Sequence, residues 1–144
     1  MELEHNTLLW RSRIHFTPTQ SHSIEVDTVV MDLEDSVAEH RKGAAREALF
    51  HGIQASPEEG PEVAVRINAP SGNQTRASDD LELLLPLRQL ECIVIPKVEH
   101  DSDIFFVIQR AQQLRPEGCV VSLAAEDDCM YCRRDADLPT LLTA

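Results

Sequence analysis

Residues 28–37 read Thr-Val-Val-Met-Asp-Leu-Glu-Asp-Ser-Val, a β-branched and apolar run that passes directly into acidic residues. The acids are Asp32, Glu34 and Asp35. A loop in water would not need the apolar run, and a strand inside a core would not need the acids. The segment therefore predicts a buried strand whose carboxyl end opens into a polar site.

Strand and helix patterns alternate on both sides of this segment. Apolar residues at helical spacing predict an amphipathic helix over residues 38–53, with Ser36 as its N-cap. Further strands are expected at residues 13–16, 63–68, 92–96 and 118–123. Later helices are expected from Ser78 or Asp79 to residue 87, over residues 101–114 and, with a weaker pattern, over residues 138–142. The helix over 101–114 is expected to bury an apolar stripe that includes Phe105.

Each strand and the helix after it occupy about 30 residues, the size of a βα repeat. Such alternation, with continuous apolar strands, predicts a parallel sheet covered by helices. Polar residues gather after each strand rather than before it, and (β/α) barrels build their active sites at that edge of the sheet. The 144 residues are therefore expected to form a single α/β domain with a functional site at the carboxyl ends of its strands.

The residues that follow the strands suit the binding of a chelating oxo-acid. A strand-end arginine such as Arg66 can hold a carboxylate through two parallel hydrogen bonds. The acids at these positions offer the oxygen ligands that Mg²⁺ prefers, and they are Glu34, Asp35, Glu126 and Asp127. A magnesium ion on a keto oxygen would stabilise the negative charge that develops there when a neighbouring carbon–carbon bond breaks or forms.

Charge and composition exclude several classes of partner. The formal net charge is −12 at pH 7, so the field of the protein repels the phosphates of nucleic acids and anionic membranes. No apolar run approaches the ~20 residues of a membrane span, and the acidic start is unlike the basic leaders of secreted or mitochondrial proteins. We therefore expect a cytoplasmic protein without nucleic-acid or membrane partners, whose four cysteines are reduced.

Six blocks of sequence occur in the order in which one known family carries them. They are Arg11-Ser12 with Phe16-Thr-Pro18, Val26 to Val37 with Lys42 and Ala45-Arg46, Val65-Arg-Ile-Asn68, Asp80-Leu81, Ile95-Pro-Lys-Val-Glu99 and Ala124-Ala-Glu-Asp127. On these blocks the chain resembles the citrate lyase beta-subunit-like branch of the HpcH/HpaI aldolase family. The blocks cover most of the chain, which makes the resemblance specific.

The resemblance implies a TIM-barrel lyase that uses Mg²⁺ and acts on CoA thioesters of hydroxy acids, such as citryl-, citramalyl- or malyl-CoA. The chain would supply a partial (β/α)8 barrel, about its first half and one later strand. On the matching positions, Arg66 would bind the oxo-acid carboxylate, with Asn68 as a second substrate-binding residue. Asp127, with Glu126 beside it, would ligate Mg²⁺, and Glu34 and Asp35 would act beside the metal, through water or from a second shell of contacts. The family resemblance also admits a mitochondrial location.

A second function remains open, that of a catalytically inactive, truncated family member which serves as a binding or assembly partner. The family's Glu-Thr-Ala-Arg-Gly type motif, whose glutamate is the other metal ligand, has no match in the sequence, and neither do the last βα units. Sheet edges left open near Arg13 and Val121 would invite pairing with another chain, so a homo-oligomer is expected.

Each site residue also has a purely structural interpretation. The acids of residues 32–35 could cap the following helix, and Arg66 could be an ordinary ion-pair partner. Lys97 and Glu99, after the strand at 92–96, could lie in a solvated loop. The spacing of residues 129 and 132, both cysteines, is that of a zinc or redox pair, but a second ligand pair is missing and they are interpreted as incidental thiols.

Overall fold

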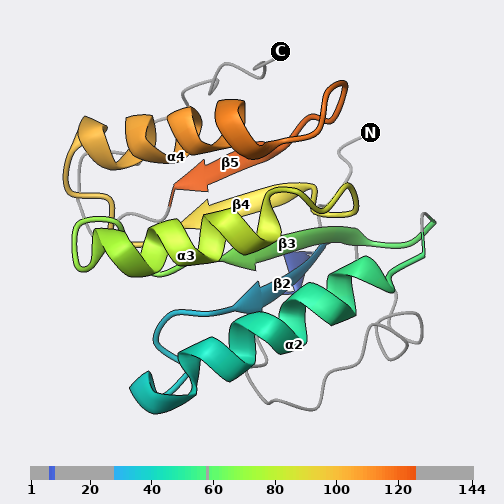
Figure 1. The fold of residues 1–144 in the computed structure, drawn as a ribbon, viewed down its shortest axis with the longest axis horizontal. Helices are drawn as coiled ribbons and strands as arrows, with labels where there is room; N and C mark the ends of the chain where they lie inside the picture. The colour runs from blue at the N-terminus through green and yellow to red at the C-terminus, as the bar shows by residue number, and fades with distance from the viewer. Residues whose placement is uncertain (1–6, 9–27, 58, 126–144) are drawn as a thin grey trace.

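A computed structural model describes residues 7–8, 28–57 and 59–125 (Figure 1). Its five-stranded sheet consists of parallel neighbours that follow one another in sequence order. The strands are β1 (Thr7–Leu8), β2 (Thr28–Asp32), β3 (Glu62–Arg66), β4 (Cys92–Ile95) and β5 (Ser122–Ala125). Residues 28–32 therefore form the strand that the sequence predicts, and it lies between β1 and β3.

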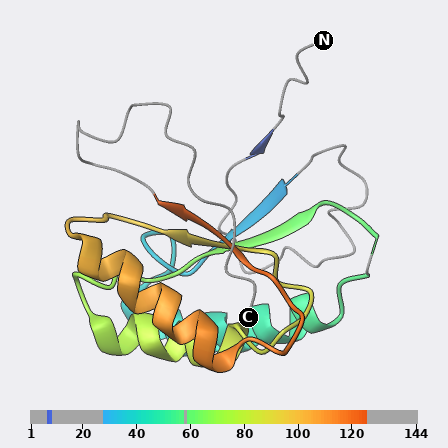
Figure 2. The same cartoon turned by 90° about the horizontal axis from the view of Figure 1, so that it is seen from above.

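The helices cover one face of this sheet. A short 3₁₀ turn, η1 (Glu39–Arg41), leads into α2 (Lys42–Gln54), which connects β2 to β3. α3 (Gln74–Leu84) connects β3 to β4, and α4 (Asp101–Leu114) connects β4 to β5. Figure 2 shows the three α-helices in a layer on the same side of the strands. In the described part of the chain, every helix is too short or too polar to cross a membrane.

The winding of the chain is that of a (β/α) barrel. Two parallel strands joined by a helix form a right-handed crossover in almost all proteins. All helices therefore lie on one face of the sheet as long as the strand order does not reverse. A doubly wound sheet reverses its strand order and carries helices on both faces. The order β1-β2-β3-β4-β5 with a single helical layer therefore confirms the predicted α/β fold of a partial barrel.

Both faces of the sheet bury apolar side chains. The main core lies between the strands and the helices, and its fully buried members include Ile53, Val65, Ile67, Leu81 and Ile93. A smaller cluster alternates with these strand residues and so lies on the opposite face, where it includes Ala64, Cys92 and Val94. Arg66 follows Ala64 by two residues, so it emerges on this second face at the carboxyl end of β3.

Several element boundaries differ from the prediction, and Ser36 is not the cap of α2. The α-helix begins at Lys42, because η1 takes up the preceding residues and Arg41 stands at the N-cap without a side-chain cap. α3 begins at Gln74, earlier than predicted, because Asn73 caps it by accepting a hydrogen bond from the Arg76 N–H at 3.2 Å.

β5 and α4 also depart from the expected pattern. β5 begins at Ser122 because the preceding residues turn at Gly118, whose φ of 74° interrupts an extended strand. In α4 the buried positions are Asp103, Val107 and Ala111, and Phe105 is 63% exposed, so its predicted place in the apolar stripe is wrong. The strand expected at 13–16, the helix expected at 138–142 and the cysteines at 129 and 132 lie outside the described residues.

Candidate functional site

Asp32, the last residue of β2, organises the turn that follows the strand. Its Oδ1 accepts a hydrogen bond from the Glu34 N–H at 2.8 Å. Its Oδ2 accepts from the Ser36 N–H at 3.2 Å and from the Ser36 hydroxyl. Such hydrogen bonds to an aspartate from backbone N–H groups a few residues ahead stabilise a turn and end the strand. The turn therefore presents Glu34 and Asp35 at the carboxyl edge of the sheet.

Arg66 lies directly beside Asp32, because the two are register partners of β2 and β3. Arg66 Nε donates to Asp32 Oδ1 at 2.9 Å and Nη2 donates to Oδ2 at 2.8 Å, which makes a bidentate ion pair. Each side chain is only 8% exposed. Burial raises the pKa of Asp32, but the hydrogen bonds from Arg66, Ser36 and the Glu34 N–H outweigh it and hold that pKa below its ordinary value.

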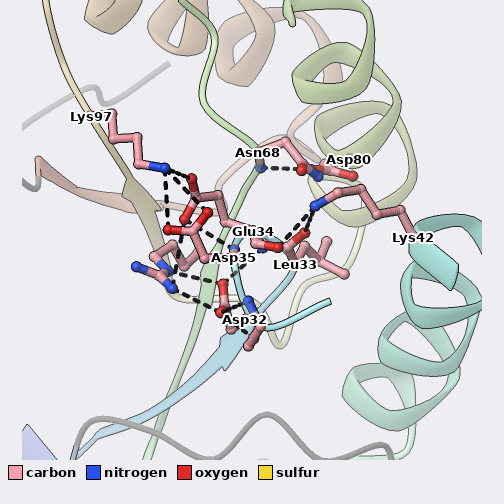
Figure 3. A network of polar contacts seen from close by, with 10 residues as sticks. Asp32, Leu33, Glu34, Asp35, Lys42, Asn68, Asp80 and Lys97 are labelled. Atoms are coloured by element: carbon pink, nitrogen blue, oxygen red, sulfur yellow. Dashed lines mark hydrogen bonds and ion pairs between the residues drawn. The ribbon is translucent and has the colours of Figure 1, made fainter. Parts of the chain in front are cut away.

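Lys97, two residues after β4, contacts the acids that follow β2 (Figure 3). Its Nζ lies 2.6 Å from Glu34 Oε1 and 3.2 Å from both carboxylate oxygens of Asp35. The other oxygen of Glu34 accepts a hydrogen bond from the Asp35 N–H at 3.0 Å and lies 3.7 Å from Arg66 Nη2. We call Asp32, Glu34, Asp35, Arg66 and Lys97 the strand-end cluster.

Anions and cations alternate within the strand-end cluster. The hydrogen bond from Lys97 lowers the pKa of Asp35, with a smaller contribution from its bond with Glu34. The contact with Glu34, followed by that with Asp35, raises the pKa of Lys97. At neutral pH, Lys97 is therefore protonated and Asp35 is ionised, so the cluster is a network of charges and not of neutral hydrogen bonds.

A second lysine fixes the backbone of the same loop. Lys42 Nζ, at the start of α2, donates to the carbonyl oxygens of Leu33 at 2.8 Å and Glu34 at 2.9 Å. The N–H of Leu33 donates to the Arg66 carbonyl at 2.9 Å, which extends the pairing of β2 and β3 by one residue. The backbone that carries Glu34 is thus held from the helix as well as from the sheet.

Asn68 lies beyond β3 and belongs to a neighbouring network. Its backbone N–H and its Nδ2 donate to Asp80 Oδ2 at 2.8 and 2.7 Å. The other oxygen of Asp80 accepts from Arg46 Nε at 2.7 Å, and Asp80 is fully buried. The carboxylate therefore ties α2, α3 and the segment after β3 together, and Figure 3 shows Asn68 and Asp80 facing one another.

The structure brings three of the predicted site residues together: Glu34, Asp35 and Arg66. It turns the amide nitrogen of Asn68 toward Asp80, so a substrate role of this residue stays a prediction. Glu126 and Asp127 lie outside the described residues. The sequence placed Asp32 among the acids of the polar site and left Lys97 open between a site role and a solvated loop, but it gave neither residue a specific role. Asp32 and Arg66 each end an apolar strand, and that shared position was a usable signal for their contact.

Of the acids that the sequence predicts as magnesium ligands, the described residues include Glu34 and Asp35. Within the described ranges there is no group of three or more Asp, Glu, His or Cys side chains arranged to hold a metal ion. The acids of the strand-end cluster are in contact with cationic side chains, Asp32 with Arg66, and Glu34 and Asp35 with Lys97. These ammonium and guanidinium groups already neutralise the negative charge of the carboxylates, which a bound metal ion would otherwise neutralise. Glu126 and Asp127, the other predicted ligands, lie outside the described residues, so the Mg²⁺ site stays a prediction.

Parallel strands wound in sequence order, helices on one face and charged residues at the strand ends define the class of (β/α)-barrel proteins whose polar site lies at that edge. The family model of HpcH/HpaI aldolase/citrate lyase matches residues 12–127 of this chain. The chain belongs to this family. The match spans the whole strand-end cluster and the predicted metal ligands.

Individual relatives are similar to this chain over part of its length. The mitochondrial citramalyl-CoA lyases of Rattus norvegicus and Homo sapiens are 37% and 36% identical over 83 residues, which are 57% of this chain and 24% of each relative. The citrate lyase subunit beta-like protein of Mycobacterium tuberculosis H37Rv is 34% identical over 106 residues, 70% of this chain and 36% of that protein. The matched region thus spans from about a quarter to just over a third of the length of these relatives.

Proposed function

We propose that the chain is part of a carbon–carbon lyase which acts on the CoA thioester of a hydroxy acid. The observation that carries this proposal is the family match over residues 12–127, because it includes the strand ends where Arg66, Glu34 and Asp35 meet. The names of the relatives favour citramalyl-CoA as the first substrate to test, with citryl-CoA and malyl-CoA as alternatives.

The proposed reaction cleaves the bond between the hydroxyl-bearing carbon and the carbon next to the thioester. The hydroxyl loses its proton and becomes the carbonyl of an oxo-acid, while the electron pair of the broken bond passes to the acyl-CoA as an enolate that then takes up a proton. A guanidinium such as Arg66 suits the carboxylate of the oxo-acid product, and an acidic pair such as Glu34 and Asp35 suits water-mediated proton transfer.

We propose Mg²⁺ as the cofactor, held by Asp127 with Glu126. The donor set of two adjacent carboxylates is chemically suited to this ion, which prefers one or two carboxylates and keeps several waters. When bound, the metal would supply positive charge to the oxo-acid oxygens. The prediction is tested by adding EDTA and then restoring Mg²⁺ in the assay below.

The test is turnover of citramalyl-CoA by the purified chain, followed as pyruvate released in the presence of Mg²⁺. Arg66→Lys is expected to lower kcat/KM by about 100-fold, because an ammonium cannot replace the bidentate fork. Arg76→Lys is the matched control, since Arg76 pairs with exposed Glu39 at the surface and should leave turnover unchanged. Circular dichroism spectra must match for all variants. Turnover that survives Arg66→Lys would contradict the assigned role.

A second candidate function is that of an inactive family member which binds or assembles without turnover. The observation that favours it is the bidentate contact with Asp32, which takes up the Nε and Nη2 edge of Arg66. Calorimetry with pyruvate, oxaloacetate and glyoxylate separates the two. Binding without turnover supports this second function, and turnover refutes it.

Self-association and location also belong to the proposal. The outermost strands of the described sheet are β1 and β5, and we propose that open strand edges lead to a homo-oligomer, which sedimentation of the concentrated protein would test. The rat and human relatives are named as mitochondrial, whereas composition favours the cytoplasm, so fractionation of cells that express the chain with a C-terminal tag would decide its location.

A further inference from the structure

Lys97 connects the ends of two strands that are not neighbours in the sheet. It follows β4, whereas Glu34 and Asp35 follow β2, and β3 lies between these strands. Its ammonium nevertheless lies 2.6 Å from Glu34 Oε1 and 3.2 Å from both oxygens of Asp35. The lysine side chain therefore bridges the carboxyl end of β3, and Figure 3 shows it reaching both acids.

The backbone of Lys97 has a conformation that residues other than glycine rarely adopt. Its φ is 49°, and no other non-glycine residue in the described ranges has a positive φ. The left-handed region is unfavourable for a residue with a Cβ, and lysine lacks the short polar side chain that lets Asn or Asp enter it. Strain of this kind persists where the surroundings impose it, and it collects at functional sites. The side chain of this strained residue contacts two acids, Glu34 and Asp35, although 46% of the side chain is exposed.

The charge balance of the strand-end cluster depends on this lysine. Glu34 is only 7% exposed, and its closest cationic contact in the described residues is Lys97 at 2.6 Å, since Arg66 lies 3.7 Å away and pairs with Asp32. Without Lys97, the only cation within 4 Å of the carboxylates at 32, 34 and 35 in the described residues would be the guanidinium of Arg66. Like charges so close together repel one another, and a buried carboxylate without a near cation is unfavourable.

We propose that Lys97 is a positioning residue, which holds Glu34 and Asp35 in place at the carboxyl edge of the sheet by bridging the end of β3. Its catalytic consequence rests on the proposed lyase function, but the bridge itself is a property of the folded chain. The inference thereby assigns a role to a residue for which the sequence pattern alone leaves both a solvated loop and a site role open.

The bridge is tested by following the titration of the Asp35 carboxyl carbon by NMR. In Lys97→Met, which keeps the aliphatic stem and removes the charge, the midpoint of Asp35 should move upward toward the ordinary value of an aspartate. Lys97→Arg should restore most of the wild-type midpoint. Arg76→Met is the matched control, because it removes a cation from a surface pair with Glu39 and should leave Asp35 unchanged.

A second variant separates the charge from the strained backbone. Lys97→Gly also removes the amine, but it fits a positive φ without strain, so it should fold even if Lys97→Met does not. Asp35 must respond to Lys97→Gly as it does to Lys97→Met. If Asp35 titrates as in the wild type in whichever of these variants folds, Lys97 does not hold it and the proposal is overturned.

The positioning role has its own readout in the lyase assay. Lys97→Met is expected to lower kcat by about 10-fold and to change KM much less, because misplaced acids slow the reaction more than they weaken binding. An unchanged kcat beside a shifted Asp35 titration would overturn the positioning role. A chain without any turnover would instead contradict the proposed function, and the titration would still decide whether the bridge exists.

Discussion

Asp80→Ala tests whether one buried carboxylate joins the helices to the loop after β3. Asp80 is fully buried in α3 and accepts hydrogen bonds from the backbone N–H and the Nδ2 of Asn68 and from Arg46 Nε, at 2.7 to 2.8 Å. Its removal therefore leaves three donors without their acceptor.

The expected loss is about 3–4 kcal/mol of the free energy of unfolding. Breaking a buried ion pair costs about 3–5 kcal/mol, and the low end applies because Arg46 Nη1 still lies 3.6 Å from Asp79. Each buried Asn68 donor adds about 1–3 kcal/mol when it loses its partner, but water that enters the vacated space offsets much of this. A loss of this size is a large part of the ~5–15 kcal/mol that stabilises a typical domain.

The assay is urea unfolding followed by circular dichroism, with the free energy taken by linear extrapolation. Asp79→Ala is the matched control, since Asp79 is the neighbouring residue, contacts the same arginine and has a side chain that is 49% exposed. It should cost less than about 0.5 kcal/mol. If the two variants lose the same stability, or if Asp80→Ala loses less than about 1 kcal/mol, then Asp80 is not the connection that the structure indicates.

Three further predictions concern stability. The pKa of Asp32 is lowered in the folded state, so the contribution of its ionised carboxylate to the free energy of unfolding is complete above the ordinary value of 3.8 and is lost as the pH falls through the lower folded value. Asp32→Asn should therefore lose less stability than the wild type between pH 7 and pH 3, measured by urea unfolding at both pH values. Arg115→Met should cost about 2–3 kcal/mol in urea, because the guanidinium donates to the carbonyls of Leu85 and Val120 at 3.1 and 2.9 Å; a loss below 1 kcal/mol would contradict this. Gly118→Ala should lower stability by about 1 kcal/mol through its φ of 74°, since no atom lies within 4 Å of the added Cβ; an unchanged midpoint would refute it.

The order and type of the elements could be predicted because buried apolar residues recur with a different period in strands than in helices. The apolar runs at 28–31 and 92–95 are strands because apolar side chains are buried on both faces of this parallel sheet. Helix starts were less predictable. Ser36 matches a cap by residue type, but its hydroxyl is already bound to Asp32, and α2 starts six residues later. Ser36 therefore takes part in the local hydrogen bonding of the turn after β2 and does not cap the helix.

The candidate site was predictable only where it follows from strand register. Parallel pairing brings the ends of β2 and β3 together, and this is why Glu34, Asp35 and Arg66 were found as a group. Lys97 was left open between a site role and a solvated loop, because no residue type near it signals the positive φ from which it contacts Glu34 and Asp35. The turn of Asn68 toward Asp80 likewise depends on the packing of α3, which the sequence pattern does not fix.

The register that builds the core also builds the strand-end cluster. Val65 and Ile67 face the helices and are fully buried, so Arg66 between them must point to the other face, where its register partner is Asp32. A slip of one residue would place the guanidinium in the apolar core and expose two apolar side chains. The hydrophobic pattern therefore enforces the ion pair, and through the turn that Asp32 caps it also sets the position of Glu34. Since a slip is excluded by the cost of burying a charge, the geometry of the site is as strongly specified as the fold.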